Sequence, residues 1–375
     1  MAKITITTTA SARLENAQGF QGKRLVQART VAHLKQKELA EESGISAQMI
    51  SLYERGKAIP PDKVVTELAS RLKSPVEFFY KPLPSSCETP VFFRSMAAAT
   101  KQDRDSAAVK LSWIGECISY FKGRITIPEY GFVANVPSKF TDIRSQDIES
   151  CAQQLRRAWE LGDAPIPNLA NVAEANGIFY FAVSLGNTSL DGLSSHRDGK
   201  HPCIVVGTEK QSACRQRFDL AHEIGHIVLH GNVTMEEFAV AANRKLIEKQ
   251  AHRFASALLL PEDAFVQSLI DTAGGTSISL ETMRDVKPYW RVSIAAMVRR
   301  LKDLNQVDDA IYKRLNIAIS RRGWRYKEPF DDELEYEQAH LLRWCLNESQ
   351  RRKVLEDNEF EQTVSMPRGF LGEIL

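Results

Sequence analysis

Several features are absent from this 375-residue sequence, and each absence narrows the possibilities. Its six cysteines form no CxxC pair, so a set of reduced thiols is the simplest interpretation. No apolar run approaches the roughly 18 residues that a membrane-spanning helix requires. The opening stretch MAKITITTTASARLE has no apolar core of the kind found in signal peptides. We therefore expect a cytoplasmic protein with no membrane partner.

The sequence also lacks charge of one dominant sign, internal repeats and low-complexity tracts. Lys and Arg number 49 against 47 Asp and Glu, which gives a formal net charge of +2. Any affinity for polyanions must therefore come from local clustering of charge. With 43% hydrophobic and 26% charged residues, the composition is that of a globular protein, and the length suggests two or three domains.

The N-terminal part reads as short helices that include a helix-turn-helix. Residues 1 to 85 are basic, with 13 Lys and Arg against 8 Asp and Glu. Within KQKELAEESGISAQMISLYERGKAIP, the spacing predicts one helix, a tight turn at Gly44 and a second helix capped by Ser46. Amide and guanidinium groups on the outer face of that helix could read base edges or reach phosphates. The outward polar residues are Gln48, Ser51 and Arg55.

The patterns Q-x-x-L-A-x-x-S-G-I-S and I-S-x-Y-E-R-G-K-x-x-P resemble the Xre, or lambda-repressor-like, family through about residues 20 to 80. The resemblance implies a double-stranded DNA operator as partner, and we expect a homodimer on two half-sites. It also implies a phosphate contact for Gln36, a base contact for Gln48 and an internal ion pair between Arg29 and Glu54. A bundle that never meets DNA is the alternative, but nearby lysines supply the charge that phosphate contact requires. The expected DNA-binding residues are Gln36, Ala47, Gln48, Ser51, Arg55 and Lys57.

The segment RFDLAHEIGHIVLHG holds the pattern H-E-x-x-H. On a helix, residues i and i+4 lie about 40° apart around the axis, so His222 and His226 project from one face and can share a tetrahedral ion. Glu223 would lie beside that ion and could take a proton from water. Core histidines are the alternative, but burying three polar groups without partners is costly. We therefore expect a Zn²⁺ site.

A catalytic zinc site needs a third protein ligand and an open position for water. Glu248 begins a second helix whose apolar positions would pack against the first, so it is the favoured ligand, and His252 is the next. His230 lies two turns from His222, too far to share the ion, and we expect it to cap the helix end. The candidates weighed are His230, Glu236, Glu237, Glu248 and His252.

The segment RFDLAHEIGHIVLH, followed by E-x-x-A-x-x-F-A-x-x-L-L-L-P, resembles the ImmA/IrrE family of zinc metallopeptidases across about residues 85 to 330. The resemblance places Glu248 on the family's third-ligand position and implies cleavage of DNA-binding repressors. One departure matters, because the family often has an acidic residue just before the alanine, where this sequence has Gln250. That change removes an alternative ligand and could alter the groups that support the ligands.

We expect an α+β fold, mainly α with a small β-sheet, in which a five-helix DNA-binding bundle is joined to a zincin-like metallopeptidase domain. Strands are predicted at GIFYFAVSL and CIVVG, and the first of them could accept a peptide along an exposed edge. The expected divisions are an N-terminal arm at 1–19, the helix-turn-helix at 20–82, a linker at 83–104, the peptidase with a helical cap at 105–330, and a C-terminal extension at 331–375.

The expected function is that of a DNA-binding transcriptional regulator with a zinc-dependent endopeptidase domain. Its protein substrate would be a repressor, an antitoxin-like protein or the chain itself. Glu223 would be the catalytic base, and His222, His226 and Glu248 would hold the metal. The alternative is a non-catalytic regulator or antitoxin in which the zinc domain serves as a sensor or a structural module.

Overall fold

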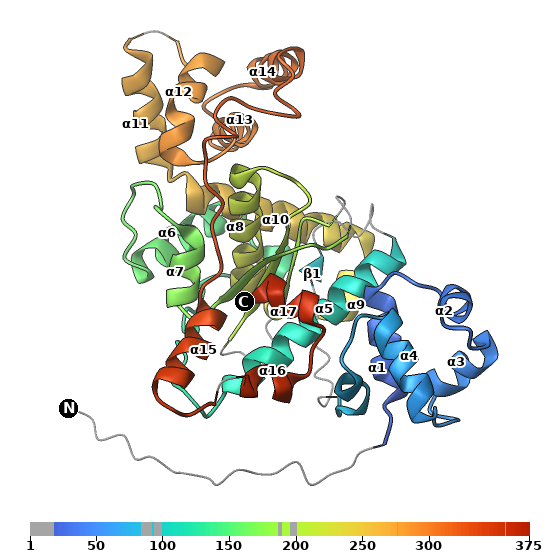
Figure 1. Cartoon of the computed structure of the whole chain (residues 1–375). Helices are drawn as coiled ribbons and strands as arrows, with labels where there is room; N and C mark the ends of the chain where they lie inside the picture. Colours follow the sequence, from blue (N-terminus) through green and yellow to red (C-terminus); the bar gives the residue numbers. More distant parts are fainter. Residues whose placement is uncertain are drawn as a thin grey trace. The chain divides into compact units, whose positions relative to one another are not determined.

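The computed structural model describes residues 19–83, 92–93, 100–186, 190–195, 201–275, 277–356 and 358–375. The chain is mainly α-helical with a small sheet, as predicted (Figure 1). It divides into two compact units, residues 1–86 with 361–371 and residues 87–360 with 372–375. Apart from Gly19, the expected N-terminal arm lies outside the described residues, as does most of the expected linker. The other boundaries expected from the sequence remain predictions.

The first unit contains the five expected helices, packed around a small apolar core. Its turn between the second and third helices is built as the sequence indicates: Gly44 is left-handed, with a φ of 70°, and the Ser46 side chain accepts a hydrogen bond from the Met49 backbone N–H. Lys81 also donates to the carbonyl of Val364 at 2.6 Å, so the C-terminal segment packs within this unit. The helices are α1 (Gly22–Val31), α2 (Gln36–Ser43), α3 (Ala47–Glu54), α4 (Asp62–Arg71) and the 3-10 helix η1 (Val76–Tyr80).

The second unit is built on a four-stranded sheet with the order β1-β3-β4-β2. β2 pairs in parallel with β4, whereas β3 runs antiparallel to both β1 and β4. β2 and β4 coincide with the two predicted strands, and β2 occupies an edge of the sheet. β3 was not predicted, because it is only four residues long. The strands are β1 (Phe92–Phe93), β2 (Phe179–Val183), β3 (Gly192–Ser195) and β4 (Cys203–Gly207).

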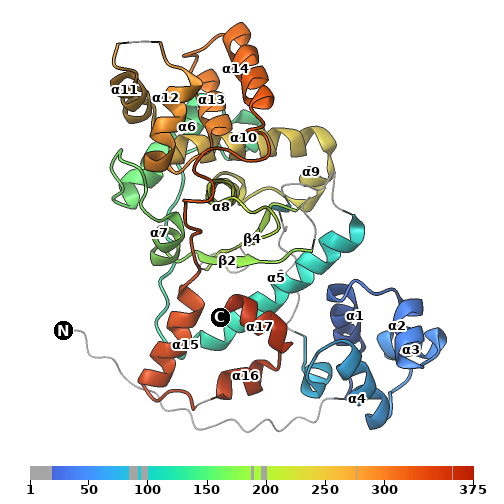
Figure 2. The same ribbon diagram turned by 45° about the horizontal axis from the view of Figure 1, so that its top comes forward.

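Two long helices lie beside this sheet and determine where the candidate site residues meet. α8 (Ala213–His230) contacts β3 and β4, and α10 (Ala241–Leu259) packs along α8 (Figure 2). α5 (Lys101–Phe121) also contacts β4, and its Lys110 donates to the carbonyl of Ser184 at 2.6 Å. The smaller elements of this part are η2 (Phe140–Asp142), α6 (Ser145–Ala158), α7 (Leu169–Ala175) and α9 (Met235–Ala239).

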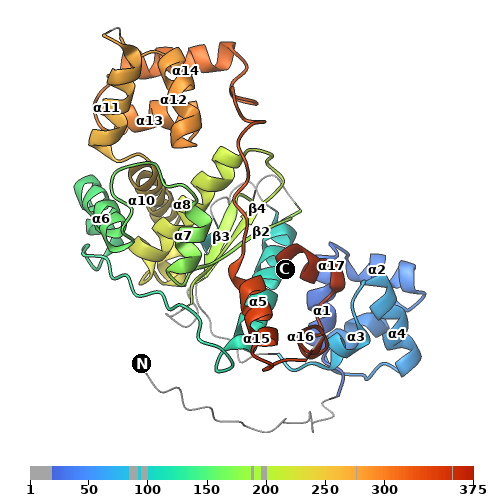
Figure 3. The same ribbon diagram turned by 60° about the vertical axis from the view of Figure 1, so that its left-hand side comes forward.

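Four further helices form a group at one end of the second unit (Figure 3). The expected helical cap corresponds to this group, in which Trp290 and Ile294 are fully or almost fully buried. The described part of the expected C-terminal extension contains α15, α16 and α17. The helices are α11 (Glu262–Ala273), α12 (Leu280–Trp290), α13 (Ile294–Asp303), α14 (Asp309–Arg321), α15 (Leu341–Arg351), α16 (Glu359–Val364) and α17 (Arg368–Ile374).

The C-terminal extension is tied to α7 and α8 by buried charged groups. Glu337 forms an ion pair with Arg217 of α8 and accepts the backbone N–H of Ala170 at 2.8 Å. In the opposite direction, Glu174 of α7 accepts the backbone N–H groups of His340 and Leu341. Burial raises the pKa of Glu174 to about 7 even though these backbone hydrogen bonds lower it. The part of the extension that ends with α15 therefore packs within the second unit, whereas residues 361–371 belong to the first unit.

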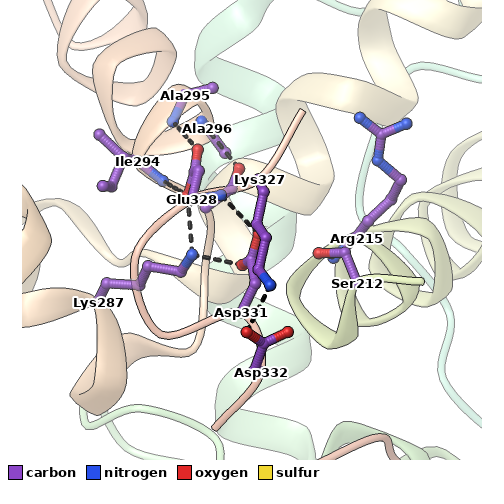
Figure 4. A network of polar contacts seen from close by, with 11 residues as sticks. Ser212, Arg215, Lys287, Ile294, Ala295, Ala296, Lys327, Glu328, Asp331 and Asp332 are labelled. Carbon is purple, nitrogen blue, oxygen red and sulfur yellow. Dashed lines mark hydrogen bonds and ion pairs between the residues drawn. The ribbon is translucent and has the colours of Figure 1, made fainter. Parts of the chain in front are cut away.

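A buried lysine joins the cap to the segment that follows it (Figure 4). Lys287 is fully buried, and its ammonium group lies 3.0 Å from Glu328 and 2.6 Å from Asp331. Burial lowers the pKa of Lys287, but the two carboxylates more than offset that effect, so its pKa is raised. Glu328 also accepts the backbone N–H groups of Ile294 and Ala295 at the start of α13.

A Glu328→Ala substitution should lower the free energy of unfolding by about 3–5 kcal/mol, because it removes one of the two carboxylates that neutralise the buried Lys287 and also the acceptor of two backbone N–H groups at the start of α13. Urea unfolding followed by circular dichroism would measure the loss. Lys327→Met is the matched control, since Lys327 pairs with Asp332 but both side chains are mostly exposed, and exposed pairs contribute little. If the two substitutions lowered the free energy of unfolding equally, the contact between Glu328 and the buried Lys287 would have no special role in stability.

The cysteines that the structure describes are buried: Cys117, Cys151, Cys203, Cys214 and Cys345. Burial raises the pKa of the Cys151, Cys214 and Cys345 thiols to about 12, which makes them poor nucleophiles. Over the described ranges, none of the helices has both the length and the hydropathy that a bilayer span demands.

Candidate metal centre and nucleic-acid interface

Helix α8 brings the two motif histidines together on one face. Its start is capped by Ser212, whose side chain accepts the backbone N–H of Arg215, and nearly all of its residues are buried, as the apolar flanks of the motif indicate. One turn of helix separates His222 from His226, and their Nε2 atoms lie 3.0 Å apart. Both side chains are almost fully buried, at 1% and 0% exposure.

Glu248 reaches the same point from α10. Its Oε2 lies 3.2 Å from Nε2 of His222, and its Oε1 lies 3.5 Å from Nε2 of His226. One ligand atom from each of these three residues lies within 4.8 Å of the others, and within the described part of the chain only this group of His, Cys, Asp and Glu is so arranged. The other third-ligand candidates, His230, Glu236, Glu237 and His252, do not belong to it.

The close approach of the two helices depends on Gly225. A Cβ atom at this position would lie 3.2 Å from the carbonyl oxygen of Ala251 and 3.1 Å from the Phe254 ring. A side chain there would push α10 outward, and Glu248 would move with it. The glycine inside the H-E-x-x-H pattern therefore contributes to assembling the ligand set, which the sequence alone did not reveal.

The donor set fits zinc. Two imidazole nitrogens and one carboxylate oxygen are the ligands of catalytic zinc sites, in which a fourth position stays open. The space for that position is present, because a pocket of about 390 Å³ is lined by His222, Glu248 and His252. The His252 ring lies 6.2 Å from that of His222, measured between centroids, so His252 belongs to the pocket wall.

Glu223 follows His222 on α8, and a residue of the sheet holds its side chain. Its side chain is fully buried, and its Oε2 accepts a hydrogen bond of 2.7 Å from the hydroxyl of Ser194 in β3. The hydrogen bond fixes the direction of the carboxylate. Sequence reasoning missed Ser194, because a serine in an unpredicted four-residue strand carries no recognisable signal.

His230 does not act as the expected cap of α8. Its ring is completely buried and contacts His226 on one side and Gln250 on the other, while Gly231 ends the helix. Burial lowers the pKa of His230 to about 4, although the Gln250 hydrogen bond acts in the opposite direction. The expectation failed because helix geometry predicts only the distance from His222 and not the partners across α10.

The helix-turn-helix presents the expected polar residues on its outer surface. Gln48, Arg55 and Lys57 are exposed, Ala47, Ser51 and Gln36 are partly exposed, and Ile50 and Tyr53 are buried. The predicted ion pair between Arg29 and Glu54 is present at 2.5 Å. Gln36 donates from its amide to the same carboxylate at 2.6 Å, so its side chain is held in place at the start of α2.

Comparison with known families covers both parts of the chain. Residues 25–79 match the helix-turn-helix model, and residues 173–302 match the M78 peptidase model, described as the IrrE N-terminal-like domain. The chain joins a helix-turn-helix domain to an IrrE N-terminal-like domain. The IrrE N-terminal-like domain contains the H-E-x-x-H segment, Glu248 and most of the sheet, whereas the C-terminal extension lies outside the match.

Other comparisons add little. The crystal structure of Bacillus thuringiensis PlcR in complex with the peptide PapR7 and DNA is 13% identical and covers 94% of each chain, with a TM-score of 0.16. A likeness this weak supports no argument about either domain. No curated protein gives a significant match.

Proposed function

We propose that this chain is a DNA-binding transcriptional regulator whose IrrE N-terminal-like domain is a zinc-dependent endopeptidase. Its substrate would be a repressor, an antitoxin-like protein or the chain itself. The observation that carries the proposal is the convergence of His222, His226 and Glu248 at one point. His222 and Glu248 also line a pocket, and Glu223 follows His222 along α8. A structural zinc site would have four protein ligands and no open position.

Each residue of the centre has a role that follows from its position. His222, His226 and Glu248 would hold zinc, which when bound acts as a Lewis acid that polarises a carbonyl group and makes water more acidic. Glu223 would accept the proton of the attacking water and later return it to the leaving amine. Ser194 orients that carboxylate by its hydrogen bond. The pocket wall at His252 would lie against the substrate.

The decisive experiment is to purify the protein, measure its zinc content and co-express it with repressors from its genomic neighbourhood. The proposal expects about one zinc per chain and specific fragments of one partner, or of the chain itself. Protein that holds stoichiometric zinc and represses a promoter without ever producing a fragment would instead support the non-catalytic alternative, in which the domain is a sensor.

For the first domain, we propose that α3 reads the operator and that its flanks contact phosphates. The residues concerned are Gln36, Ala47, Gln48, Ser51, Arg55 and Lys57. A protein that binds as a homodimer would cover two half-sites about one helical turn apart. The exposure of Gln48, Arg55 and Lys57 supports this assignment.

Two substitutions should separate base reading from phosphate contact. Gln48→Ala should weaken operator binding by about 1–3 kcal/mol and relax the preference for one base pair, whereas Lys57→Ala should weaken binding to all sequences and make it less sensitive to salt. Fluorescence anisotropy with operator and scrambled duplexes at several salt concentrations measures both effects. The control is Lys73→Ala, because Lys73 is an exposed lysine that follows α4. If Gln48→Ala weakened both duplexes equally, base reading by this residue would be excluded.

A further inference from the structure

A line of polar groups runs from His226 away from the metal-binding point. Nδ1 of His226 lies 3.2 Å from Nδ1 of His230, and Nε2 of His230 lies 3.0 Å from Oε1 of Gln250. The amide nitrogen of Gln250 donates to the carbonyl oxygens of Phe140 and Ile143, at 2.8 and 3.2 Å. His226, His230 and Gln250 are all at least 97% buried, so water does not compete for these contacts.

The direction of each hydrogen bond in this line is determined by its far end. The two backbone carbonyl oxygens can only accept, so the NH₂ group of Gln250 must point toward them. Its oxygen then faces His230 and can only accept as well. Nε2 of His230 must therefore carry the proton that forms this contact.

The same reasoning continues through both histidine rings. A neutral imidazole has one donor and one acceptor nitrogen, so with Nε2 of His230 protonated, its Nδ1 is an acceptor. It can only accept from Nδ1–H of His226, which leaves the lone pair of His226 on Nε2. Nε2 of His226 lies 3.5 Å from Oε1 of Glu248 and 3.0 Å from Nε2 of His222.

We propose that His230 and Gln250 are positioning residues that hold His226 in the tautomer that binds metal, and that they thereby raise zinc affinity. The inference rests on the proposed function, because it assumes that His226 is a ligand. It gives a physical reason for the amide at position 250. A glutamine can donate to two carbonyls and accept from His230 at the same time, whereas a carboxylate would place negative charge against those carbonyl oxygens.

Zinc affinity, measured by competition with a chromophoric chelator, tests the inference without an activity assay. His230→Leu and Gln250→Leu should each lower the affinity about tenfold to a hundredfold, the usual effect of removing a group that supports a ligand. His230→Gln should stay close to wild type, because its amide can accept from His226 and donate to Gln250. His340→Leu, which removes an exposed histidine ring far along the chain, is the control.

Long-range ¹H–¹⁵N NMR of the zinc-free full-length protein gives a second reading, which remains available if His230→Leu does not fold. It should show His226 protonated on Nδ1 and His230 protonated on Nε2. The inference is overturned if His226 carries its proton on Nε2, or if His230→Leu and Gln250→Leu bind zinc as tightly as wild type. Wild-type protein that binds no zinc would overturn the proposed function itself, which is a different result.

Discussion

A Glu223→Gln variant should lose peptide cleavage by a factor of about 10² to 10⁴, the usual contribution of a positioned general base, while keeping its zinc. Glutamine is nearly the same size and can still accept from Ser194, so the fold and the ligand set should survive. The amide cannot take a proton from water at neutral pH. Fragments of a co-expressed partner, quantified by mass spectrometry over time, would measure the loss.

Two controls separate loss of the base from a general defect. Glu236→Gln makes the same chemical change on an exposed part of α9 and should leave cleavage unchanged. Ser194→Ala removes the hydrogen bond that orients Glu223 and should reduce cleavage less than Glu223→Gln does. If Glu223→Gln cleaved as fast as wild type, Glu223 would not be the base, whatever the zinc content.

A Glu248→Ala variant should bind zinc at least about a hundredfold more weakly than wild type, since removing a ligand should exceed the effect of removing a group behind it. The loss of zinc affinity should also appear as a loss of the stabilisation that zinc gives to the folded protein. A ligand present at a hundred times its Kd adds about 2.7 kcal/mol to the free energy of unfolding, so zinc should raise the melting temperature of wild type and not that of the variant. Titration calorimetry measures the zinc affinity, and scanning calorimetry with and without added zinc measures the melting temperature.

His252→Asn is the matched comparison for Glu248→Ala. His252 was the second candidate for the third ligand and lies one turn beyond Glu248 on α10, but it lines the pocket instead of joining the ligand cluster. The variant should therefore keep its zinc affinity. Loss of zinc from His252→Asn together with unchanged binding by Glu248→Ala would reverse the assignment.

The sequence was sufficient to predict the parts of the centre that depend on local spacing. His222 and His226 meet because they are four residues apart on a helix, and Glu248 approaches them because its helix carries an apolar face. The sequence was also sufficient for the turn at Gly44 and for the two strands with strong β-propensity. In each case a pattern of a few neighbouring residues determines the geometry.

The supporting groups could not be predicted, because they depend on contacts between segments far apart in the chain. Ser194 reaches Glu223 from a strand that has no clear sequence signal, and Gln250 reaches His230 across two packed helices. In the sequence, the role of His230 could be predicted only from its spacing to His222 along α8. Glu337 and its partner Arg217 are likewise 120 positions apart in the sequence.

The segment that follows the family match limits where the second unit can be truncated. The family match ends at residue 302, yet Glu328 and Glu337 lie beyond that point and neutralise Lys287 and Arg217, both of which are buried. A shortened protein that stopped at the end of the match would leave two cations in the interior without their counter-charges. We therefore expect the smallest fragment able to fold to extend beyond Glu337, and we expect proteolytic removal of this region to destabilise the unit.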